Sequence, residues 1–159
     1  MEISQLLNQG YRYALSLTHN PALAEDLLQD AWESMLKLSA PQEIAYLITT
    51  IRNKFLNHKK RENVIPFLSL DESVSEAELM DSDADFSEVM ANKDLLEQKL
   101  AELDLYEREV LYLFYYEEYS TTEIAELVGS GKGVVCSLIY RSRSKLRKLL
   151  EAEMPRVAL

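Results

Sequence analysis

The stretch over residues 119–148 constrains the fold of this 159-residue chain more than any other part. Ser120 with Glu123 three residues later has the pattern of a capping box, which starts a helix. Gly129 is placed to end that helix, because glycine adopts the left-handed conformation of a helix C-terminus without strain. A second, longer helix is expected from about Val134. The sequence therefore predicts two helices joined by a short glycine-containing turn.

The second helix of this pair has an apolar face and a basic face. Its predicted buried stripe follows helical spacing and comprises Val135, Ile139, Ser142, Leu146 and Leu149. Its cations form another stripe, with Arg141, Lys145 and Lys148 flanked by Arg143 and Arg147. One interpretation is an ordinary helical hairpin with a solvated charged face. The agreement of glycine placement, caps and charge favours the other, a DNA-binding helix-turn-helix.

The formal charge of −10 argues against a plain nucleic-acid binder, so the distribution of charge matters. Residues 1–61 carry seven basic and six acidic groups, and residues 105–159 carry eight of each. Residues 62–104 carry two basic and thirteen acidic groups. The acidity is therefore concentrated in the middle of the chain, between two nearly neutral ends with local basic clusters.

Composition also limits the class of protein. The longest apolar runs, such as residues 110–116, are far shorter than the ~20 residues of a membrane-spanning helix, and no secretory signal is evident. The single cysteine, Cys136, cannot form an internal disulfide, which suits a reducing compartment. Neither zinc-ligand spacing nor a catalytic constellation is present. We therefore expect a cytoplasmic protein without membrane insertion that is not an enzyme and uses no cofactor or metal.

The N-terminal part is predicted to be helical. After a helix over residues 2–18, Asn20 and Pro21 form a cap and a first helical position for a helix over Pro21–Leu38. The core face of this helix is predicted to comprise Leu23, Leu27, Ala31, Met35 and Leu38. An acidic stripe lies elsewhere on the helix, with Asp26, Asp30 and Glu33 and with Gln29 beside them. This stripe is either a solvated surface or a docking face for a basic partner.

A third helix is expected to start at Pro41. Its predicted buried face comprises Ile44, Leu47, Ile48, Ile51 and Phe55. Asn53 and Asn57 lie on its polar face, and positive charge collects at its end in the run 58–61, HKKR. This charge either complements the helix dipole or contacts phosphates, while the amides are suited to reading base edges.

The acidic residues 62–84 read as a flexible linker, because self-repulsion and low hydrophobicity oppose packing. Asp85 with Glu88 predicts the start of a further helix, and Asp104 with Glu107 predicts a restart. We thus expect an all-α chain of two small helical domains, residues 1–61 and 85–159, joined by the linker at 62–84.

In this order the segments resemble the bacterial alternative sigma factors of the extracytoplasmic-function (ECF) group. AEDLLQDAWESMLKL (24–38) is similar to the polymerase-docking helix of the family, and AYLITTIRNKFLNHKKR (45–61) is similar to its helix for opening and reading the −10 promoter element. The segment from Leu100 to Leu150 is similar to its second domain, which reads the −35 element.

The resemblance implies partners and roles. The partners would be core RNA polymerase, promoter DNA and an anti-sigma factor, and the acidic linker would either thread a basic polymerase channel or serve as a tether. The polymerase-binding residues would be Asp26, Gln29, Asp30 and Glu33. The −10 region would be Arg52, Asn53, Asn57, Lys59, Lys60 and Arg61. The −35 contacts would come from Thr121, Thr122, Lys132, Ser137, Arg141, Arg143, Lys145 and Arg147.

The chain departs from the family pattern in the recognition helix. Two positions that are usually basic are Cys136 and Leu138, and Ser130 stands where the turn usually has an apolar residue. Cys136 is either a redox-sensitive thiol or a small side chain at or beside the DNA surface. A sigma factor that directs promoter recognition and strand opening is the expected function. The alternatives are a conventional helix-turn-helix regulator and a sigma-like interaction protein that does not direct initiation.

Overall fold

The computed structural model of the chain describes residues 2–61, 75–81, 86 and 93–153. Contacts divide the chain into two compact units, Met1–Leu68 and Ser69–Leu159. Helices and turns account for the described residues, with no strand among them. The predicted all-α fold with two helical domains is therefore confirmed.

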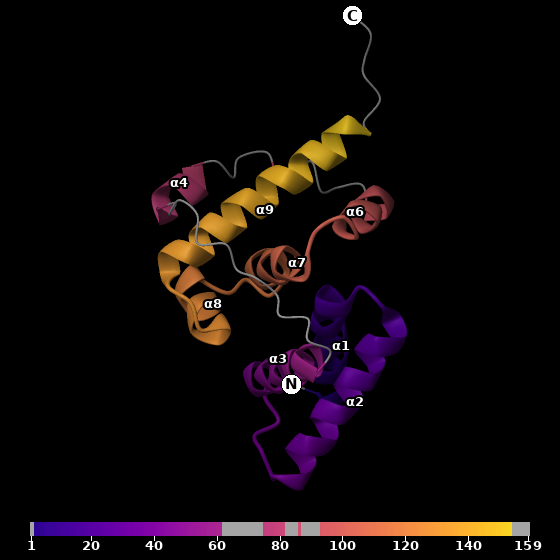
Figure 1. Cartoon of the computed structure of the whole chain (residues 1–159). Coiled ribbons are helices and arrows are strands. Elements are labelled where there is room, and N and C mark those ends of the chain that lie inside the picture. The colour runs from indigo at the N-terminus through magenta and orange to yellow at the C-terminus, as the bar shows by residue number, and fades with distance from the viewer. Residues whose placement is uncertain (1, 62–74, 82–85, 87–92, 154–159) are drawn as a thin grey trace, which may run out of the picture. The chain divides into compact units, whose positions relative to one another are not determined.

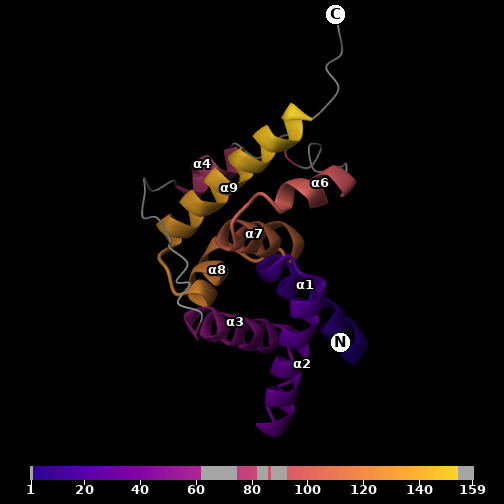
Figure 2. The same cartoon turned by 45° about the vertical axis from the view of Figure 1, so that its right-hand side comes forward.

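The first unit is a three-helix bundle of α1 (Ile3–Thr18), α2 (Pro21–Lys37) and α3 (Ile44–Arg61), each of which packs against the other two (Figure 2). Its fully buried side chains include Leu6, Tyr13, Leu17, Ala31, Met35, Leu47, Ile48, Ile51 and Phe55. This core contains the whole predicted face of α3 except Ile44, which is partly exposed. Leu38 was predicted to be buried but is 72% exposed, because α2 ends at Lys37 and the chain turns away.

Local signals place the helices of this unit. The Asn20 side chain accepts the Leu23 backbone N–H at 3.2 Å, and Pro21 follows at the first helical position, as predicted. Helix α3 begins at Ile44, three residues later than the expected start at Pro41. Gly10 allows a close approach, because a Cβ atom there would lie 2.6 Å from Leu47 Cδ2 and 2.9 Å from Leu28 Cδ1. The bundle is thus tightly packed where α1 meets α2 and α3.

The second unit is organised around α9 (Lys132–Ala152). In the described part of the chain α9 packs against α4 (Glu76–Asp81), α6 (Lys93–Leu100), α7 (Leu105–Leu111) and α8 (Thr121–Val128), which surround it in Figures 1 and 2. A π-helical segment, η1 (Tyr112–Tyr116), continues directly from α7. Buried apolar residues on α9, among them Val135, Ile139, Leu146 and Leu150, form the centre of this unit.

Helix α4 lies inside the stretch that was expected to be a linker. It packs against α9, and Leu79 on it is completely buried. The linker prediction is therefore wrong for residues 76–81, whose acidic composition conceals one buried leucine. Residues 62–74 and 82–84 and the predicted capping box of Asp85 with Glu88 lie outside the described residues. Phe86, which lies between Asp85 and Glu88 in the sequence, is described and is completely buried.

Candidate nucleic-acid interface

The acidic stripe of α2 faces solvent. Asp26, Gln29, Asp30 and Glu33 are all exposed, on the side of the helix away from the buried Ala24, Leu27, Ala31 and Met35. Asp30 Oδ2 lies 3.9 Å from Lys54 Nζ, and its side chain keeps 60% of its exposure. An exposed pair at this distance contributes little to stability, so the stripe stays accessible to a partner.

Helix α3 divides the predicted −10 residues between its two faces. Asn53 and Asn57 are exposed, and Lys59 is partly buried with its Nζ 5.5 Å from the Phe55 ring centroid. Arg52 is only 7% exposed, so the prediction that it belongs to the outer surface is wrong. Its side chain is therefore packed within the bundle, although Asn53, the next residue, is exposed. The side chains of Lys60 and Arg61 lie outside the described residues.

The helix-turn-helix forms as its capping residues predict. The Ser120 hydroxyl accepts the Glu123 N–H at 3.1 Å, and the Glu123 carboxylate accepts the Ser120 N–H at 3.0 Å. Gly129 has φ +69°, which is the left-handed conformation expected of it. The Ser130 N–H then donates to the Ala125 carbonyl at 3.1 Å, and α9 starts two residues later. These bonds fix where the two helices begin.

Several predicted DNA residues of this unit are buried. Thr121 and Ser137 are each 1% exposed, so their assignment as surface contacts is wrong for the free chain. Cys136 is also 1% exposed, which contradicts its expected place at or beside the DNA surface. Burial raises the pKa of the Cys136 thiol, whereas reactive cysteines have a lowered pKa. The structure therefore favours an unreactive thiol at this position.

Arg143 has a structural position. Its side chain is 1% exposed, with Nη1 donating to the Tyr115 hydroxyl at 2.9 Å and Nη2 donating to the Leu79 carbonyl at 2.8 Å. The prediction that Arg143 widens an exposed basic stripe is wrong. Helical spacing placed this arginine at the boundary between the buried and exposed faces, and α4 covers that boundary.

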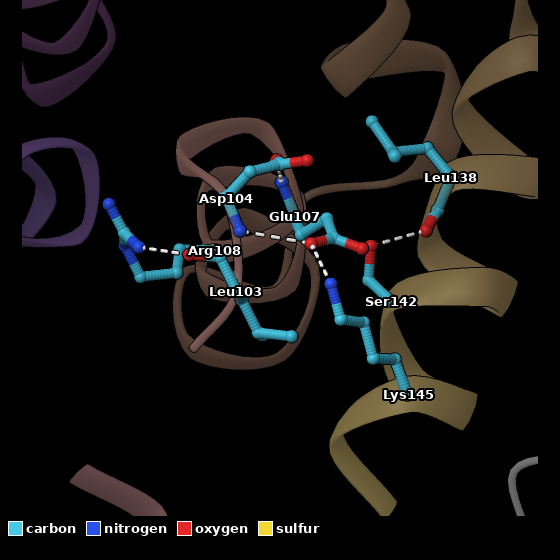
Figure 3. Close-up of polar contacts among 7 residues, drawn as sticks. All are labelled: Leu103, Asp104, Glu107, Arg108, Leu138, Ser142 and Lys145. Carbon is cyan, nitrogen blue, oxygen red and sulfur yellow. Dashed lines mark hydrogen bonds and ion pairs between the residues drawn. The ribbon is translucent and has the colours of Figure 1, made fainter. Parts of the chain in front are cut away.

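A second polar network ties α7 to α9 (Figure 3). Asp104 and Glu107 form the predicted capping box, and the Glu107 carboxylate also accepts a charged hydrogen bond from Lys145 Nζ at 3.1 Å. Beside it, Arg108 donates to the Leu103 carbonyl, and the buried Ser142 hydroxyl donates to the Leu138 carbonyl at 2.6 Å. Lys145 was expected to be a free surface cation, but it neutralises a carboxylate that is nearly buried.

The remaining predicted residues of the helix-turn-helix reach the surface. Thr122, Lys132 and Lys145 are exposed, and Arg141 and Arg147 are partly exposed. Lys148, the third member of the predicted outer stripe, is exposed as well. The spacing of Arg141, Lys145 and Lys148 places them on one outward face of α9. This face is the candidate surface for DNA phosphates.

The described residues contain neither a membrane-spanning helix nor a metal-binding cluster. None of these helices is long and apolar enough to cross a membrane. Histidine, cysteine and acidic side chains form no group of three within this part of the chain that could hold a metal ion.

Comparison with known proteins agrees with both units. Residues 3–64 match the family described as Sigma-70 region 2, and residues 93–146 match Sigma-70, region 4. The ECF RNA polymerase sigma factor SigL of Mycobacterium tuberculosis is 30% identical over 89% of this chain and 82% of its own length. The ECF RNA polymerase sigma factor SigM of Bacillus subtilis is 29% identical over 93% of each chain.

Among solved structures, the sigma factor RpoE of Bartonella quintana, crystallised in complex with the anti-sigma factor NepR, has a similar fold. The TM-score is 0.66 with 20% identity, and the match covers 96% of both chains. The order of the two regions and the identity to the named relatives lead to one assignment. The chain belongs to the ECF group of sigma-70 RNA polymerase sigma factors.

Proposed function

We propose that this chain binds core RNA polymerase through the acidic face of α2 and directs the enzyme to promoters, where it initiates transcription. The proposal rests on one observation above all. A three-helix unit matching region 2 is followed by a separate unit matching region 4 with an intact helix-turn-helix. The promoter DNA and the polymerase are thus the expected partners, and the chain acts as an initiation factor without a cofactor.

Within this function the first unit, residues 1–61, has two tasks. Asp26, Gln29, Asp30 and Glu33 face solvent together and would meet a basic polymerase surface. The exposed Asn53 and Asn57 lie one helical turn apart on α3 and would contact bases of the −10 element. Lys59, Lys60 and Arg61 follow at the end of that helix, where cations would contact the DNA backbone.

The second unit, which includes α4, would read the −35 element. Its recognition helix is α9, on which Arg141, Lys145 and Lys148 offer three outward cations. Thr122 and Lys132 lie at the starts of α8 and α9, and hydroxyls, lysines and helix N-termini are groups that contact DNA phosphates. Because the partner polymerase works in the cytoplasm, we place the chain there. An anti-sigma factor is a further expected partner, as the solved relative has one.

A core-binding titration tests the docking face. Changing Asp26→Lys together with Asp30→Lys reverses two charges at the contact and should weaken binding by ~2 kcal/mol or more, about 30-fold. A control with Glu2→Lys and Glu43→Lys makes the same change in net charge at exposed residues outside the stripe. Equal affinities of the two variants would rule out the α2 face as the docking site.

Holoenzyme binding to a panel of −35 duplexes tests the DNA face. Arg141→Ala should weaken binding to all sequences alike and reduce the slope of log K against log salt by about one, because a phosphate contact carries no sequence information. If neither affinity nor slope changes, α9 does not contact DNA through this face.

A further inference from the structure

A short acidic helix holds the two starting points of the helix-turn-helix in the free chain. Glu76 is the first residue of α4, and its Oε2 lies 2.7 Å from Lys132 Nζ. Its Oε1 accepts a hydrogen bond from the Thr121 hydroxyl at 3.3 Å. Thr121 is the first residue of α8 and Lys132 is the first residue of α9. One carboxylate therefore bridges the positions where both DNA-facing helices begin.

The contact of α4 does not depend on this exposed bridge alone. Leu79 is completely buried, and its carbonyl accepts the Arg143 Nη2 hydrogen at 2.8 Å. This carbonyl belongs to the last turn of α4, where carbonyls accept hydrogen bonds from groups outside the helix. A buried arginine thus completes the end of α4, and a buried leucine anchors its centre.

The residues that meet α4 and Phe86 share one face of α9. Lys132, Arg143 and Arg147 are separated by eleven and four residues, which are close to whole numbers of helical turns. The Arg147 guanidinium lies 5.8 Å from the centroid of the buried Phe86 ring. The sequence predicted that Lys132, Arg143 and Arg147 contact DNA. In the free chain these three residues contact α4 and Phe86 instead.

The chemistry of the bridge is that of a phosphate site. Helix-turn-helix proteins receive DNA phosphates on hydroxyls, lysines and helix N-termini, where the helix dipole favours an anion. The Glu76 carboxylate has the same charge and meets the same kinds of group. Its hydrogen bond and charge interaction with Lys132 lower the pKa of Glu76, so the carboxylate is ionised at neutral pH.

We propose that α4 is an autoinhibitory clasp, in which Glu76 occupies the place of a DNA phosphate at the start of the helix-turn-helix. Helix α4 has to leave before this unit binds duplex DNA. The clasp would keep the free chain from binding DNA away from the polymerase. The inference rests on the proposed function, since it assumes that the helix-turn-helix binds DNA.

The test compares the free full-length chain with two variants on a labelled 20-base-pair duplex of random sequence. A random duplex is sufficient, because the clasp competes with phosphates and not with bases. Glu76→Gln removes the bridge, whereas Glu97→Gln removes the same charge from an exposed site on α6. We expect Glu76→Gln to bind about two- to fivefold tighter than Glu97→Gln, the range set by an exposed ion pair. Equal affinities would overturn the clasp.

Amide hydrogen exchange provides a second measurement on the unmodified chain. Adding the duplex should accelerate exchange at the amides of residues 79–81, and unchanged exchange in the DNA complex would overturn the proposal. The holoenzyme separates this failure from failure of the proposed function. If Arg141→Ala weakens −35 binding but Glu76→Gln and Glu97→Gln bind the duplex with equal affinity, the proposed function is supported and the clasp is refuted. If Arg141→Ala has no effect either, the proposed DNA face of α9 is refuted together with the clasp.

Discussion

Replacing Arg143 tests whether this residue supports the second unit or contacts DNA. Arg143→Met keeps a long side chain in the buried site but removes the donors to the Tyr115 hydroxyl and the Leu79 carbonyl. The Leu79 carbonyl loses the hydrogen bond from a charged donor, which costs about 1–3 kcal/mol. The Tyr115 hydroxyl is only partly buried, so its lost bond adds about 1 kcal/mol.

Burying the Arg143 cation itself costs desolvation free energy, and replacing it with methionine removes this cost. This gain offsets part of the loss. We therefore expect the free energy of unfolding of the second unit to fall by about 2–3 kcal/mol. For a unit of this size the midpoint temperature should drop by roughly 8–20 °C. Because the two units need not unfold in one transition, their signals have to be separated.

The chain provides its own internal control for the assay. Trp32 is the single tryptophan and lies in α2, so its fluorescence reports unfolding of the first unit. Far-ultraviolet circular dichroism reports both units. Arg143→Met should shift the dichroism transition and leave the Trp32 transition unchanged. Lys148→Met, on an exposed position of the same helix, should change stability by no more than ~0.5 kcal/mol. If Arg143→Met is as stable as the wild type but binds DNA more weakly, Arg143 contacts DNA and does not support the fold.

Three further changes test the account of the second unit. Gly129→Ala should destabilise this unit by about 1 kcal/mol in thermal unfolding, because its φ of +69° strains any side chain; wild-type stability would contradict that strain. Cys136 should react with a thiol reagent far more slowly in the native chain than in denaturant, because burial raises the pKa of its thiol. Equal rates would show that the thiol is accessible to solvent in the native chain. Lys145→Ala should lower stability by ~1 kcal/mol as well as weaken DNA binding, because Glu107 loses its cation; an effect on DNA alone would contradict the network.

The sequence predicted local structure well, because caps and breaks depend on neighbouring residues. Asn20, Asp104, Ser120 and Gly129 each form the cap or helix end expected of them. The apolar faces of the helices also follow spacing closely, as the buried Ile48, Ile51 and Phe55 show for α3.

Contacts between distant segments could not be predicted in the same way. Arg143 is buried because Leu79, 64 residues earlier, supplies an acceptor and a covering side chain. The helical spacing of residues in α9 cannot predict that α4 covers this position. Similarly, the acidic residues around Leu79 gave the stretch the composition of a linker, although a single buried leucine and an arginine partner suffice to dock it. The sequence thus placed the candidate residues on their helices, while the exposure of each residue depended on non-local packing.

Run-off transcription with purified core polymerase over a library of promoter sequences tests the central claim most directly. We expect transcripts that depend on the chain, that come from promoters sharing a −35 and a −10 element, and that are lost with Asp26→Lys and Asp30→Lys. A chain that binds core polymerase but yields no such transcripts would be a sigma-like interaction protein. A chain that binds promoter DNA but not core polymerase would be a conventional helix-turn-helix regulator. Either result would contradict its function as a sigma factor.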